Sequence, residues 1–170
     1  MLHQYNQLPN CQSGDAELLL AGRVDILGVN YYQPRRVKAR DNAINPGAPF
    51  MPEWFFDPYE MPGRKMNPHR GWEIYEKGIY DILMNLKTNY DNLPCYISEN
   101  GMGVEGEDRF IEEGQVNDQY RIEFIREHLR WLHKGISEGR TVKGITCGLS
   151  LTIGHGVTHT KTVTDWYNWI

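Results

Sequence analysis

Residues 95–103 of this 170-residue chain read CYISENGMG, and this stretch decides the fold. Its first four residues are typical of a β-strand, and the glycines that follow Asn100 break the strand. Glu99 therefore stands where a strand ends. In an α/β barrel, the carboxyl ends of the strands form the rim where the loops gather and where functional side chains lie. The stretch predicts an α/β fold with Glu99 on that rim.

Two further segments favour strands of the same kind. Residues 24–32, VDILGVNYY, are mostly apolar rather than strictly alternating, which is typical of a parallel strand covered on both faces. Residues 142–145, VKGI, begin another strand. Helical patterns occupy residues 13–22, 72–89 and 117–139.

The third helix has apolar residues at helical spacing. The predicted core stripe consists of Ile122, Ile125, Leu129, Leu132 and Ile136. This assignment leaves His128 and His133 in solvated positions.

Strands and helices alternate along the chain, which implies parallel βαβ units with right-handed crossovers. A closed barrel needs about eight strands and about 250 residues. We therefore predict an α/β fold that is a partial (β/α)8 TIM barrel, its C-terminal part, with about three parallel strands and three helices.

The composition is that of an ordinary globular protein. With 40% hydrophobic and 24% charged residues and a net charge of −4, nothing indicates a nucleic-acid or membrane surface. Three cysteines without metal-like spacing predict free thiols in a reducing compartment, and no targeting segment is recognisable, so we expect a cytoplasmic protein. We expect no cofactor and no metal. His155 and His159 have a helical metal-ligand spacing, but their segment is a poor helix former.

Two motifs carry a resemblance to a known family. Residues 25–32, DILGVNYY, followed by residues 96–101, YISENG, resemble glycoside hydrolase family 1, the family of β-glucosidases and 6-phospho-β-glycosidases. The resemblance covers roughly residues 1–144 and implies a (β/α)8 barrel with a retaining mechanism. Glu99 matches the catalytic nucleophile, Tyr32 the tyrosine that donates a hydrogen bond to it, and Asn30 a substrate-binding asparagine.

The chemistry is consistent with these roles. A nucleophilic carboxylate must stay ionised while its partner acid stays protonated, and a phenol that donates a hydrogen bond to Glu99 favours the ionised form. The alternative interpretations are a salt-bridging carboxylate for Glu99 and a packing role at the barrel rim for Tyr32.

One departure from the family concerns the second carboxylate. The family's general acid/base is a glutamate in an Asn-Glu-Pro motif on an earlier strand, and this chain contains no such motif. Met1 falls about two strands after the expected position. A retaining pair must lie about 5–5.5 Å apart, so we expect the chain alone to be inactive.

The other departure is the tail, residues 145–170. Inserting one T before the codon for Ile145 permits the reading YHMWTFIDNWSWSNAYKNRYGLVQLD, which resembles the family's missing end. Several outcomes are nearly forced, since Asp165 followed by Trp166 must give Leu in that frame. We therefore expect an out-of-frame tail after a barrel portion of residues 1–144.

The expected parent activity is hydrolysis of a small-molecule substrate, a 6-phospho-β-glucoside. The recovered frame contains serine, lysine and tyrosine, which can donate hydrogen bonds to a phosphate. A β-glucosidase or β-galactosidase acting on unphosphorylated sugars is the nearer alternative. A non-catalytic remnant is the alternative of another class. No feature indicates an oligomeric state.

Overall fold

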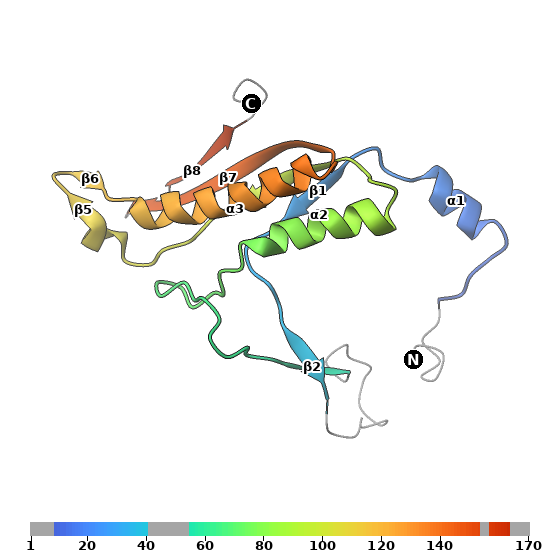
Figure 1. Cartoon of the computed structure of the whole chain (residues 1–170), viewed down its shortest axis with the longest axis horizontal. Coiled ribbons are helices and arrows are strands. Elements are labelled where there is room, and N and C mark those ends of the chain that lie inside the picture. The colour runs from blue at the N-terminus through green and yellow to red at the C-terminus, as the bar shows by residue number, and fades with distance from the viewer. Residues whose placement is uncertain (1–8, 41–54, 154–156, 164–170) are drawn as a thin grey trace.

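The computed structural model of the chain describes residues 9–40, 55–153 and 157–163. These residues form an α/β fold around one four-stranded sheet (Figure 1). Its strands, in spatial order, are β1 (Leu27–Asn30), β4 (Cys95–Asn100), β7 (Val142–Ile153) and β8 (Val157–Val163). The first three are parallel, and β8 is antiparallel to β7. The predicted partial barrel with three parallel strands is confirmed, and the described sheet does not close on itself.

Three α-helices accompany the sheet: α1 (Asp15–Ala21), α2 (Lys77–Asn89) and α3 (Gln119–Ser137). α2 and α3 lie side by side and pack against each other, whereas α1 lies apart at the β1 end (Figure 1). The alternation of helices and strands is the predicted one. Helix α2 begins later than expected, because the segment from Trp72 to Glu76 is an extended approach to the helix.

The core lies between the sheet and the pair α2 and α3. Val29, Ile97 and Ile145 come from three neighbouring strands, and all three are buried in one cluster. Ile79 and Leu83 of α2 pack into the same cluster with no exposed surface. Each such side chain stabilises the fold by roughly 1.5–3 kcal/mol. This packing fixes the sheet, and with it the carboxyl ends of the strands.

The face that α3 buries agrees with the predicted stripe only in part: Leu132 is buried, and Ile125 and Leu129 are partly buried and pack against the core. Its buried residues are Arg121, Phe124, His128, Leu132 and Gly135. Ile122 is 53% exposed and Ile136 is 39% exposed, so both lie outside the core.

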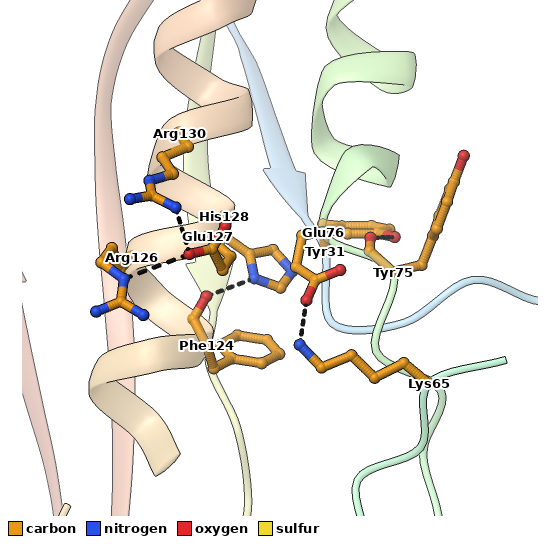
Figure 2. Close-up of polar contacts among 9 residues, drawn as sticks. All are labelled: Tyr31, Lys65, Tyr75, Glu76, Phe124, Arg126, Glu127, His128 and Arg130. Atoms are coloured by element: carbon orange, nitrogen blue, oxygen red, sulfur yellow. Dashed lines mark hydrogen bonds and ion pairs between the residues drawn. The ribbon is translucent and has the colours of Figure 1, made fainter. Parts of the chain in front are cut away.

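The prediction of a solvated His128 was wrong, because its side chain is fully buried. Its ring stacks on Phe124 with the centroids 3.9 Å apart, and Nδ1 lies 2.8 Å from the Phe124 carbonyl oxygen (Figure 2). Tyr31 lies on the other side, with ring centroids 6.1 Å apart.

The connections after β1 and β4 contain short elements of secondary structure. They are β2 (Val37–Ala39), β3 (Phe56–Pro58), the 3-10 helix η3 (Glu107–Phe110), β5 (Ile111–Glu112) and β6 (Gln115–Val116). β2 pairs with β3, and β5 pairs with β6, both antiparallel.

Two features of the ends differ from expectation. The predicted apolar face of α1 is not covered, since Leu18, Leu19 and Leu20 are 66–77% exposed. The tail forms β8, which pairs with β7 between Ile145 and Ile153 and was not predicted. Of the two tail histidines, His159 lies in β8, and His155 lies outside the described residues. No helix of the described part is long and apolar enough to span a membrane.

Candidate active site

The side chains of Glu99 and Tyr32 meet at the carboxyl ends of β1 and β4. The Tyr32 hydroxyl donates a hydrogen bond to Oε2 of Glu99 at 3.0 Å. Glu99 is exposed and Tyr32 is half-buried. The two parallel strands bring together residues that are 67 positions apart in the sequence. One oxygen of an exposed carboxylate is thus held by a phenol.

Asn30 lies beside this pair on β1, where it is the ladder partner of Glu99. Its Oδ1 accepts a hydrogen bond from Ser98 Oγ at 2.7 Å, which orients the amide. The structure thus brings Asn30, Tyr32 and Glu99, the three residues selected from the sequence, to one end of the sheet. The ladder between β1 and β4 is irregular at this point, because Val29 pairs with Ile97 and the next residue pairs with Glu99.

Tyr31 and Asn100, the sequence neighbours of Tyr32 and Glu99, are both buried. Tyr31 is buried and donates from its hydroxyl to the Tyr75 carbonyl oxygen at 2.7 Å. Asn100 is fully buried and donates from Nδ2 to the Tyr31 carbonyl oxygen at 2.8 Å. The Tyr31 backbone N–H donates to the Glu99 carbonyl oxygen at 2.9 Å. Alternation along the strand ends therefore directs Tyr32 and Glu99 outward together.

Electrostatics keep the Tyr32 hydroxyl protonated. Partial burial raises the pKa of Tyr32 above its ordinary value, and the hydrogen bond to Glu99 raises it further. Burial also raises the pKa of Tyr31. Both phenols remain donors through the neutral range.

The loop that follows Glu99 is held by a buried cation on α3. Arg121 is 1% exposed and donates from Nε to the Met102 carbonyl oxygen at 3.1 Å. Its guanidinium forms ion pairs with buried Glu107 and with Asp118. A buried charge is tolerated only when it is paired in this way. No signal in the sequence identified this residue, because its first partner is a backbone carbonyl 19 residues away.

The long connection between β1 and α2 is also fixed beside the site. Arg36 forms a two-point ion pair with Glu73, with Nη2 2.7 Å from Oε1 and Nε 3.1 Å from Oε2. Trp72 packs edge-on against the Tyr32 ring at a centroid distance of 6.1 Å. Asn67 reaches the loop after Glu99, with Nδ2 2.9 Å from the Gly103 carbonyl oxygen. Trp72 therefore contacts the Tyr32 ring, and Asn67 contacts the loop that follows Glu99.

Within the described residues, no group of three or more His, Cys, Asp or Glu side chains is placed to hold a metal ion. Two grooves lie away from Glu99. One, of about 680 Å3, lies between the end of α1 and the loop before β4, and the other, of about 630 Å3, runs along the exposed flank of α3.

Comparisons with known proteins agree with this geometry. The family model Glycosyl hydrolase family 1 matches residues 1–152. The chain is 64% identical over 138 residues to 6-phospho-beta-glucosidase GmuD of Bacillus subtilis, which covers 81% of the chain and 30% of that protein. It is 36% identical over 122 residues to Beta-glucosidase A of Thermotoga maritima, covering 72% of the chain and 24% of that protein.

Solved structures give the same result. The family 1 β-glucosidase from Thermotoga maritima superposes with a TM-score of 0.67 at 28% identity, covering 86% of this chain and 30% of that one. The chain thus spans about a third or less of the length of the relatives it matches. The family model covers most of the chain, and the fold agrees with it. The chain therefore belongs to glycosyl hydrolase family 1.

Proposed function

We propose that this chain contributes the nucleophile of a retaining β-glycosidase, and that Glu99 is that nucleophile. The observation that carries the proposal is the hydrogen bond from the Tyr32 hydroxyl to Glu99 Oε2 at the carboxyl ends of adjacent parallel strands. Active sites of α/β barrels lie at that end.

In this mechanism Glu99 is the nucleophile, and a second carboxyl group acts first as the acid and then as the base. Glu99 attacks the anomeric carbon while a second carboxyl group protonates the leaving oxygen, which gives a glycosyl ester. The second group then deprotonates a water that hydrolyses the ester, so the configuration is retained overall. Tyr32 holds Oε2, which leaves Oε1 as the attacking atom, and Asn30 offers its amide to a sugar hydroxyl.

The second carboxyl group must come from a part of the barrel outside this sequence, since the sequence has no Asn-Glu-Pro. Without it, nothing protonates the leaving oxygen. The 170-residue chain alone should therefore give no turnover.

The proposed substrate is a 6-phospho-β-glucoside, a small molecule. The support is the 64% identity to a protein named 6-phospho-beta-glucosidase, against 36% for a β-glucosidase. A phosphorylated sugar does not cross membranes freely, so the cytoplasm is the proposed location. Hydrolysis of unphosphorylated β-glucosides or β-galactosides is the alternative substrate class.

We also infer that residues 145–170 are read out of frame and that the barrel portion is residues 1–144. The support is the family-like string in the neighbouring frame. Resequencing the DNA from the codon for Gly144 to that for Ile170 tests this. An additional base, or a neighbouring frame that encodes the family-like string, would establish the inference, and a neighbouring frame without that string would reject it.

A chimera tests the function directly. In this GmuD chimera, residues 1–144 of this chain replace the matching segment of the Bacillus subtilis relative, which supplies the rest of a barrel. We expect hydrolysis of a para-nitrophenyl 6-phospho-β-glucoside. A second version, which also carries the recovered-frame string in place of residues 145–170, tests the substrate. Its preference for the unphosphorylated glucoside would overturn the substrate proposal and leave the glycosidase proposal standing.

A second candidate is a non-catalytic remnant. It is favoured by the exposed leucines of α1 and by β1, whose outer edge has no partner among the described strands. Such an edge promotes aggregation. A cooperative thermal melt of a monomeric chain would argue against this candidate, and an aggregate without a melt would support it.

A further inference from the structure

A compact turn closes the connection between β1 and α2. The Asn67 N–H donates to the Trp72 carbonyl oxygen at 2.7 Å, and the Gly71 N–H donates to the Asn67 carbonyl oxygen at 2.9 Å. Residues 67–72, which we call the rim turn, are therefore fixed by their own backbone.

The side chain of Asn67 joins the rim turn to the loop that follows Glu99. Asn67 is 2% exposed. Its Nδ2 donates to the Gly103 carbonyl oxygen at 2.9 Å, and its Oδ1 accepts from the His69 N–H at 2.9 Å. A buried amide with both functions satisfied is costly to disturb, because each unpaired group loses its hydration without compensation.

The other end of the rim turn contacts Tyr32. The Trp72 ring lies edge-on to the Tyr32 ring, and the Arg70 guanidinium lies 4.6 Å from the Trp72 ring centroid. Arg70 also packs against Gly103, where an added Cβ would come within 2.7 Å of Nη1. The contacts form a closed circuit: Glu99, Tyr32, Trp72, then the rim turn to Gly103, and back along the backbone to Glu99.

We propose that Asn67 is a positioning residue for Glu99: it ties the loop that directly follows Glu99 to the turn that supports Tyr32. The proposal rests on the function proposed for Glu99. A side chain that couples two loops holds the carboxylate and its hydrogen-bond donor in one geometry, which a retaining attack requires. Gly103 is part of the same arrangement, because a Cβ at this position would lie 2.7 Å from Arg70 Nη1 and the guanidinium would have to move.

The test follows the Tyr32 hydroxyl in the 170-residue chain and needs no activity. The chain is labelled with 13C at tyrosine Cζ, Tyr32 is assigned from Tyr32→Phe, and its alkaline titration is recorded by NMR. Glu99→Gln removes the carboxylate and sets the benchmark, a shift of the Tyr32 titration toward that of free tyrosine. We expect Asn67→Leu, which is similar in size, and Gly103→Ala to produce a shift in the same direction.

The matched control is Asn85→Leu, which makes the same change at an exposed position of α2 and should leave the titration unchanged. Circular dichroism of each variant shows whether it folds. If Asn67→Leu does not fold, Gly103→Ala still displaces Arg70, the second link between the rim turn and this loop. A wild-type titration in both variants, while Glu99→Gln moves it, would overturn the role of Asn67 alone. A wild-type titration in Glu99→Gln would instead overturn the Tyr32–Glu99 pair and the positioning role with it.

Discussion

At the scale of residues, the site consists of the hydrogen bond from Tyr32 to Glu99 and the groups that orient it. Glu99 was selected from its place at the end of a predicted strand. Tyr32 and Asn30 were selected from the resemblance of two motifs to glycoside hydrolase family 1. Asn67 and Arg121 could not be found in this way. Each donates a hydrogen bond to a backbone carbonyl. Every residue has such a carbonyl, so the sequence does not show which one is the acceptor.

Removing the Tyr32 hydroxyl should weaken catalysis more than stability. In the GmuD chimera, Tyr32→Phe should lower kcat/KM about 10- to 100-fold, since a hydrogen bond to a charged group contributes about 1.5–3 kcal/mol. Steady-state kinetics with the para-nitrophenyl 6-phospho-β-glucoside measure this. Tyr59→Phe, at an exposed tyrosine, is the control. Equal rates for Tyr32→Phe and the parent chimera would contradict the proposed role.

His128 should make the stability of the chain depend on pH. Burial lowers the pKa of His128, and the Phe124 carbonyl opposes that shift. The unfolded chain therefore binds a proton at higher pH than the folded chain. The contribution to stability is complete above the unfolded pKa near 6.5 and decreases as the pH falls, by at most about 1.4 kcal/mol per pH unit.

Urea unfolding at about pH 8 and about pH 5.5 measures this dependence. His128→Phe should reduce the loss of stability on acidification relative to the wild type. His133→Phe, at an exposed position of the same helix, should not. An identical acid response in all three proteins would show that His128 is not the titrating group.

At the scale of elements, the alternation of strands and helices was predictable, but the face of α3 was predicted only in part. The expected stripe included Ile122 and Ile136, whereas the structure buries Arg121 and His128. The buried positions recur at spacings of three and four residues, so the periodicity was present. The predicted stripe counted only apolar residues, but Arg121 is paired with Glu107 of η3 and His128 is bonded within α3 to the Phe124 carbonyl oxygen.

The buried ion pair of Arg121 and Glu107 should couple α3 to η3. Arg121→Met should cost about 3–5 kcal/mol in the free energy of unfolding, because it leaves the Glu107 carboxylate buried and unpaired. The double variant Arg121→Met with Glu107→Leu should recover much of that loss. A double-mutant cycle by urea unfolding measures the coupling. Additive losses in the double variant would show that the two side chains act independently.

At the scale of the whole molecule, two apolar surfaces border the described fold. One is the α1 side, with its exposed leucines, and the other is the flank of α3 that carries Ile122. The matched segment corresponds to about 30% of GmuD. The sequence could not indicate β8, because the tail has no family pattern from which to predict it.

The most direct test of the central claim is to trap the covalent intermediate on Glu99. The GmuD chimera is incubated with a 6-phospho-β-glucoside whose sugar carries fluorine next to the anomeric carbon and whose leaving group is good, so that ester formation outpaces hydrolysis. Intact and peptide mass spectrometry then locate the label. The account predicts one glycosyl group on the peptide containing Glu99 and none in Glu99→Gln. A label on another carboxylate, in a chimera that turns over substrate, would contradict it.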